Sequence, residues 1–136
     1  MSAETNIQIA QKAYADFGRG DISALLNAVD EKVEWVTPDI GHAPGGTYRG
    51  RAEVARFFQQ VGETWEFRAF EPREYIASGD QVALLGSYAF TSRATGRSAS
   101  CDWAMVWKMR DGKVVHFQEY VDTAVLRDAL TQAVAA

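Results

Sequence analysis

The chain has 136 residues, of which 47% are hydrophobic, 12% aromatic and 24% charged, and its net charge is −4 at pH 7. This length and composition predict one globular domain, spanning residues 1–136, with room for a substantial core. The basic residues are scattered, so nucleic acid is not expected as a partner, because phosphate binding requires clustered Lys and Arg.

Several other classes of protein are also excluded. Cys101 is the only cysteine, so no intramolecular disulfide can form, and with His42 and His116 it does not make a metal-ligand set. No glycine-rich phosphate loop or nucleotide fingerprint is present, so we expect no cofactor. The sequence contains neither a signal-peptide pattern nor an apolar run long enough to cross a bilayer, which predicts a cytoplasmic protein without membrane contact.

Apolar residues at helical spacing predict three helices in the first half of the chain. The first helix has Thr5 and Gln8 as a capping box and ends at the glycines of residues 18–20. The second follows Asp21 as its cap and extends to Val29. Residues 33–36 form a short strand, and residues 37–50 form a loop rich in proline and glycine. The apolar stripe of the third helix consists of Val54, Phe57, Phe58 and Val61.

From Trp65 onward the pattern changes to strands. We expect strands at residues 65–77, bent near Pro72, and at residues 81–93, 98–109 and 114–121, with a final helix from Thr123. This order predicts an α+β fold, a cone-shaped roll in which three N-terminal helices pack on a curved antiparallel sheet and a short helix closes the chain.

The C-terminal strands carry the largest side chains. Trp103, Met105 and Trp107 occur at every second position and therefore share one face of their strand. Such an apolar wall is typical of a core or of a pocket for a small hydrophobic molecule. The aromatic content favours a pocket, and its predicted lining is Trp35, His42, Tyr48, Phe58, Trp65, Tyr88, Trp103, Met105 and Tyr120.

The chain resembles the SnoaL-like and ketosteroid-isomerase-related proteins of the nuclear transport factor 2-like superfamily. The resemblance covers nearly the whole sequence. It depends on Tyr14 with Gly20-Asp21, on Val33-Glu34-Trp35, on residues 46–51 leading into Phe57-Phe58, on residues 110–114, and on Glu119-Tyr120-Val121-Asp122. It implies a small-molecule site without a cofactor, in a fold that serves cyclases, isomerases and non-enzymatic binders.

Only some of the catalytic residues of these enzymes have a counterpart in this chain. Trp35 stands where steroid isomerases have a general-base Asp, and Met105 where they have a protonated acid and where many cyclases have a His. Tyr14 resembles the hydroxyl donor of the isomerases, and Asp122 resembles the acid/base Asp of the cyclases. Limonene-epoxide-hydrolase chemistry is less well matched, because no Arg lies between Asp102 and Asp122 on a suitable strand face.

Each candidate also has a structural interpretation. Asp122 precedes a helix and is expected to cap it, to act as an acid/base, or both. Asp102 and Glu119 are interpreted as structural or interface charges, with the reservation that a shift of one residue in register would turn Glu119 inward. His42 and His116 fit solvated positions, and Cys101 fits a small apolar residue.

The sequence therefore leaves three functions open. The first is catalysis of proton transfer on a hydrophobic carbonyl compound, with Asp122 as acid/base and Tyr14 as the hydroxyl donor. The second is a non-catalytic binding module for an apolar metabolite, and the third is a dimeric interaction scaffold. A homodimer is expected in each case, because the outer face of such a sheet is partly apolar.

Overall fold

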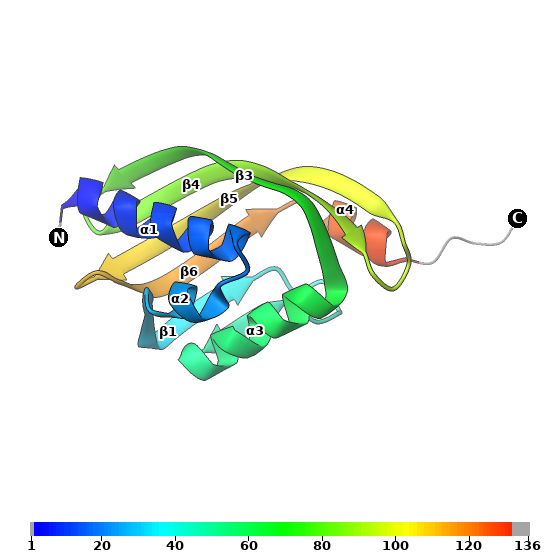
Figure 1. The fold of residues 1–136 in the computed structure, drawn as a ribbon, viewed down its shortest axis with the longest axis horizontal. Coiled ribbons are helices and arrows are strands. Elements are labelled where there is room, and N and C mark those ends of the chain that lie inside the picture. The colour runs from blue at the N-terminus through cyan, green and yellow to red at the C-terminus, as the bar shows by residue number, and fades with distance from the viewer. Residues whose placement is uncertain (1, 132–136) are drawn as a thin grey trace, which may run out of the picture.

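The computed structural model describes residues 2–131, which form a curved sheet covered on one face by helices (Figure 1). The helices are α1 (Ala3–Gly18), α2 (Ile22–Leu26), α3 (Arg51–Thr64) and α4 (Thr123–Leu130). The strands are β1 (Val29–Thr37), β2 (Gly46–Arg49), β3 (Trp65–Ser78), β4 (Gln81–Ser92), β5 (Ser98–Arg110) and β6 (Lys113–Val121). The predicted α+β architecture is confirmed, and the short α4 follows the last strand as expected.

The helix ends differ from the prediction at two places. Ser2, not a Thr5–Gln8 capping box, caps α1, because its hydroxyl accepts a hydrogen bond from the backbone N–H of Thr5 at 3.1 Å. Asp21 caps α2 as expected, accepting from the N–H of Ala24 at 3.1 Å. That helix stops at Leu26, and Val29 instead begins β1, where its side chain is fully buried.

The six strands lie in the order β2-β1-β6-β5-β4-β3. The meander from β3 to β6 is antiparallel, as predicted, but β1 runs parallel to β6, so the sheet is not antiparallel throughout. The loop predicted for residues 37–50 contains the edge strand β2, which pairs with β1 from Glu34↔Arg49 to Thr37↔Gly46. The prolines and glycines before β2 concealed this short strand in the sequence.

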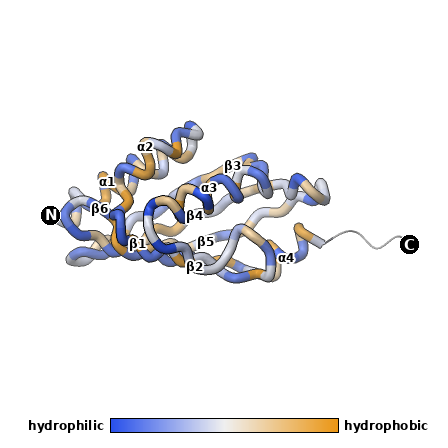
Figure 2. The backbone as a smooth tube through the Cα atoms, turned by 90° about the horizontal axis from the view of Figure 1, so that it is seen from below, coloured by the Kyte–Doolittle hydropathy of each residue, from blue (hydrophilic) through white to orange (hydrophobic). Residues whose placement is uncertain are grey.

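Alternation along the strands places the core between the sheet and the helices. Along β5, Trp103, Met105, Trp107 and Met109 are buried, whereas the residues between them are more exposed. Figure 2 shows that hydrophobic and hydrophilic residues are interspersed along the chain. The concave face of the sheet, beneath α1 and α3, therefore holds the core.

No helix within residues 2–131 has the length and apolar character required to cross a lipid bilayer.

Candidate active site

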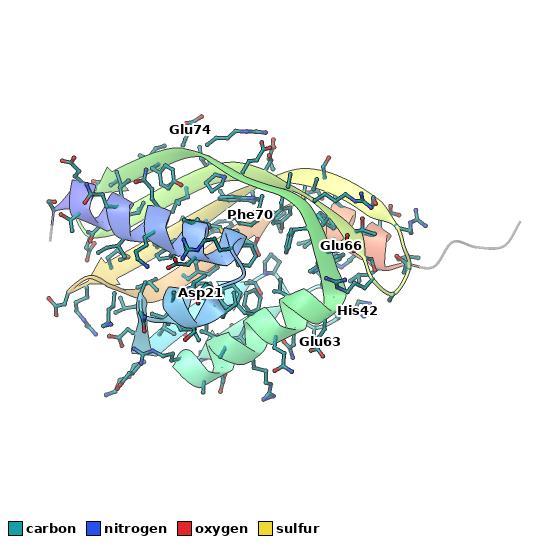
Figure 3. All side chains as sticks on the ribbon, in the orientation of Figure 1. Asp21, His42, Glu63, Glu66, Phe70 and Glu74 are labelled. Carbon is teal, nitrogen blue, oxygen red and sulfur yellow. The ribbon has the colours of Figure 1, made fainter. Side chains whose placement is uncertain are left out.

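A cavity of about 100 Å³ lies on the concave side of the sheet. Helix α1 contributes Ala13, Tyr14 and Phe17, and α3 contributes Phe57, Phe58 and Val61. The loop between β1 and β2 contributes Pro38, Ile40 and Pro44, and α4 adds Leu126. The remaining wall comes from the sheet and from α2, through Leu25, Trp35, Thr37, Trp65, Phe67, Phe70, Tyr88, Phe90, Met105, Trp107, Phe117 and Glu119. In Figure 3, Phe70 points toward the middle of the molecule, whereas Glu74 and Glu63 lie at its periphery.

Glu119 is the one carboxylic acid among the described residues that line this cavity. It lies on β6 directly opposite Met105 of β5, and two residues earlier Phe117 lies opposite Trp107. Since Met105 and Trp107 point into the core, the same pairing turns Glu119 inward. Burial raises the pKa of Glu119 from 4.5 to about 7, and this effect exceeds the lowering by the hydrogen bond from Tyr88.

Tyr88 holds one oxygen of this carboxyl group. Its hydroxyl donates to Oε2 of Glu119 at 3.3 Å. Tyr88 is itself 6% exposed, and burial raises the pKa of its phenol well above 10, so that it stays a neutral donor. Cys101 lies opposite Tyr88 on β5, and burial raises the pKa of its thiol to about 11. The thiol therefore remains protonated at neutral pH and is a poor nucleophile.

Tyr14 reaches the cavity from α1, but its hydroxyl is already engaged. The Nε1–H of Trp107 donates to it at 3.1 Å, and the hydroxyl donates to the sulfur of Met105 at 2.9 Å. Burial raises the pKa of Tyr14 well above 10, with a smaller lowering by the Trp107 hydrogen bond. As an oxyanion donor, Tyr14 would first have to release Met105.

Six of the residues predicted for the site line the cavity: Tyr14, Trp35, Phe58, Trp65, Tyr88 and Met105. Two others lie outside its lining. Trp103 is 3% exposed and packs over Gly86 of β4, where a Cβ atom would lie 2.6 Å from its Cζ2. The hydroxyl of Tyr48 accepts from the N–H of Gly45 at 3.0 Å and donates to Gln60 at 2.9 Å, which anchors the loop before β2.

Three predicted residues, Tyr120, Asp122 and His42, lie away from the cavity. The direction in which β6 turns its side chains explains the positions of Tyr120 and Asp122. Phe117, Glu119 and Val121 face inward, so Tyr120 points outward with 58% of its surface exposed. Asp122 follows the strand, is exposed, and caps α4 by accepting from the N–H of Ala124 at 3.0 Å. His42 is also exposed, and in Figure 3 it lies at the periphery near the end of α3. Within residues 2–131 no cluster of His, Cys, Asp or Glu could hold a metal ion.

Sequence reasoning did not select the acid that faces the cavity. Glu119 shares a strand face with Phe117 and Val121, and that apolar pair was the available signal that this face points inward. The aromatic residues Phe17, Phe67, Phe70 and Phe90 also line the cavity without having been predicted. The side chain of Phe17 contacts Phe58, Phe67 and Phe70, with ring centroids 4.9 to 5.8 Å apart.

Comparison with known proteins agrees with this architecture. Residues 10–117 match the SnoaL-like domain, so the chain belongs to this family. Two solved NTF2-like proteins are similar over 96% of this chain and 99% of their own. The one from Burkholderia xenovorans LB400 is 35% identical with a TM-score of 0.87, and the one from Burkholderia pseudomallei K96243 is 34% identical with a TM-score of 0.88.

A third similar structure is that of TerC, which was co-crystallised with polyporic acid. It is 32% identical over 93% of this chain and 98% of that chain, with a TM-score of 0.82. Among curated protein sequences no match was found. The fold and the family are therefore established, and the chemistry has to be argued from the residues of the cavity.

Proposed function

We propose that the protein binds a small, neutral, apolar carbonyl compound in the cavity and that Glu119 exchanges a proton with it. The observation that carries this proposal is a carboxyl group whose pKa burial raises to about 7, on the wall of an aromatic cavity. An acid/base is most effective when its pKa lies near the working pH, because both of its forms are then populated. Glu119 takes the acid/base role that the sequence suggested for Asp122.

The charge and size of the cavity support a neutral ligand. None of the described lining residues is Lys, Arg or His, so an anionic ligand would meet a carboxyl group without a compensating positive charge. The volume of about 100 Å³ is smaller than the engineered apolar cavity of about 150 Å³ that binds benzene, which favours a ligand with a single small ring. TerC, with the same fold, was crystallised with a small organic molecule, which also supports a small-molecule ligand.

The proposed step is proton abstraction next to a carbonyl group. The ionised Glu119 takes the proton of a ligand C–H bond, and the electron pair of that bond moves into the ligand, which becomes an enolate. Return of a proton from Glu119 to carbon, at the same or another position, completes an exchange or an isomerisation. An apolar site that excludes water favours such a step, because the carboxylate is then less well solvated and more basic.

The test uses cyclopentanone, a small neutral ketone with exchangeable C–H bonds next to its carbonyl group. Proton NMR in deuterated buffer at pH 7 should show that the protein accelerates deuterium incorporation. Glu119→Gln should lower this acceleration at least 100-fold, whereas Asp122→Asn should leave it unchanged, because asparagine preserves the helix cap. Exchange that survives in Glu119→Gln would contradict the proposal, and loss of exchange in Asp122→Asn would return the role to Asp122.

Binding without catalysis is the second candidate, and the state of Tyr14 favours it. Both hydrogen bonds of the Tyr14 hydroxyl go to protein atoms, so that an obvious donor for an enolate oxygen is already engaged. This candidate predicts that calorimetry detects cyclopentanone binding to the wild-type protein while no deuterium exchange occurs. The third candidate, an interaction scaffold without a cavity, has the least support, because the structure contains a cavity lined in part by Glu119.

A homodimer remains part of the proposal. On the outer face of the sheet, Leu85, Ala104 and Val106 are only partly covered, and Tyr120 is 58% exposed. Apolar side chains that are left open on one sheet face favour self-association. Light scattering coupled to size-exclusion chromatography would measure the mass, and a mass near 15.0 kDa would contradict the dimer.

A further inference from the structure

The two oxygens of the Glu119 carboxyl group have different surroundings. Oε2 accepts the hydrogen bond of Tyr88 at 3.3 Å. Within residues 2–131 no group donates a hydrogen bond to Oε1. Since Glu119 lines the cavity and Tyr88 occupies Oε2, Oε1 is the oxygen left to contact a ligand.

The ring of Tyr88 is held in place from several sides. It packs against Phe67, Phe70 and Phe90, with ring centroids 5.7, 6.0 and 5.5 Å away. These contacts come from the neighbouring strand β3 and from β4 itself. A ring that is confined in this way loses little entropy when its hydroxyl forms a hydrogen bond, because its rotamer is already restricted.

The path from Tyr88 to Glu119 crosses a strand. Tyr88 belongs to β4 and Glu119 to β6, and β5 lies between them in the sheet. Two residues before Tyr88, Gly86 lies opposite Trp103, whose ring occupies the space that a Cβ atom at position 86 would need. The indole of Trp103 and the phenol of Tyr88 have centroids 6.5 Å apart. The absence of a side chain at Gly86 therefore leaves room for the Trp103 ring, which lies beside the Tyr88 ring.

We propose that Tyr88 is a positioning residue, which occupies Oε2 of Glu119 and so makes Oε1 the oxygen that exchanges the proton with the ligand. This inference rests on the proposed function of Glu119. In the neutral carboxyl group the proton lies on Oε1, because Oε2 already accepts from Tyr88. After the ligand C–H bond breaks, its proton is bonded to Oε1, and the Tyr88 hydroxyl remains the donor to Oε2 throughout.

The substrate class follows from the same geometry. A ligand has to bring either a carbon acid or a hydrogen-bond acceptor to Oε1, on the side of the carboxyl group that Tyr88 does not occupy. A neutral ketone satisfies both requirements in turn, as a carbon acid when Glu119 is ionised and as an acceptor when Glu119 is protonated. A carboxylate ligand would satisfy only the second and would add a second negative charge whenever Glu119 ionises.

The first test measures the titration of Glu119 without any ligand. Glutamate labelled with ¹³C at the side-chain carboxyl carbon gives a resonance that reports ionisation, and the spectrum of Glu119→Gln assigns it. The hydrogen bond from Tyr88 lowers the pKa of Glu119, so Tyr88→Phe should raise the midpoint by roughly one to two pH units. Tyr75→Phe is the matched control, since Tyr75 lies on β3 and is not a hydrogen-bond partner of Glu119.

The second test measures the rate of deuterium exchange into cyclopentanone as a function of pH. The midpoint of the rate profile should move upward in Tyr88→Phe with the titration midpoint. A variant with a merely structural defect would lower the rate at every pH and leave the midpoint in place, and that result would overturn the inference. An unchanged ¹³C titration in Tyr88→Phe would also overturn it. If the wild-type protein shows no exchange at all, the proposed function fails, whereas the ¹³C titration still decides whether the Tyr88 hydroxyl is bonded to the Glu119 carboxyl group.

Discussion

The two faces of β6 show how one strand serves two different environments. On the inner face, Phe117 is 3% exposed and stacks on Trp35 with ring centroids 3.8 Å apart, and Glu119 points into the cavity. On the outer face, Tyr120 is 58% exposed, and the Nδ1 atom of His116 lies 3.2 Å from Glu34. The inner face therefore determines the packing and the chemistry, while the outer face is available to solvent or to a second subunit.

The largest contrast should appear when an aromatic ring is removed from each face. Phe117→Ala should lower the free energy of unfolding by about 3–5 kcal/mol, because it deletes a buried ring that contacts Trp35 and Trp107. Tyr120→Ala should change it by no more than about 0.5 kcal/mol, as expected for an exposed side chain. Urea denaturation at low protein concentration measures both, and a large loss in Tyr120→Ala would show that the outer ring is covered in solution.

The second contrast concerns how the acids on the two faces make the free energy of unfolding depend on pH. The folded protein raises the pKa of Glu119 from 4.5 to about 7, so it binds more protons than the unfolded chain between these values. The free energy of unfolding should therefore fall as the pH rises from about 4.5 to 7, by at most about 3 kcal/mol from this group.

Comparison with a neutral side chain isolates this effect. Glu119→Gln should abolish that part of the pH dependence and should be more stable than the wild-type protein at pH 8. Asp102→Asn is the control on the outer face, since the side chain of Asp102 is 88% exposed, and it should keep the wild-type slope. If the free energy of unfolding of Glu119→Gln falls with pH as steeply as that of the wild-type protein, burial does not raise the pKa of Glu119.

The smallest predicted effect concerns Asp122, which directly follows β6 and caps α4. Asp122→Ala should lower the free energy of unfolding by about 1 kcal/mol, because the N–H of Ala124 loses its side-chain acceptor. Asp122→Asn should lower it by only a few tenths of a kcal/mol, since asparagine caps helices about as well as aspartate. Thermal unfolding of the two variants separates them, and equal losses would show that the charge of Asp122, not its cap, stabilises the protein.

The sequence was sufficient for most of the fold because its signals are local. Helical spacing from Val54 to Val61 and alternation from Trp103 to Trp107 each depend on neighbouring residues, and both predictions were confirmed. The short strand β2 was missed because its four residues follow a segment rich in glycine and proline. The parallel pairing of β1 with β6 joins two distant segments and leaves no local signal.

The site was harder to predict because it depends on which face of β6 turns inward. Alternation correctly grouped Glu119 with Phe117 and separated it from Tyr120, but it does not say which group faces the core. The pairing of Phe117 with Trp107 decides the question, and that pairing belongs to the tertiary structure. The family resemblance drew attention to Asp122, whose capping role was one of the two interpretations that the sequence offered.

The tryptophans give the protein an internal optical reporter. Trp35, Trp65 and Trp107 lie in the cavity wall, and Trp103 is buried on the same inner face of the sheet. Indole emission responds to the polarity and the quenching groups of its immediate surroundings. A molecule that enters the cavity should therefore alter the intrinsic fluorescence without any attached dye, so that compound collections can be screened on the unmodified chain.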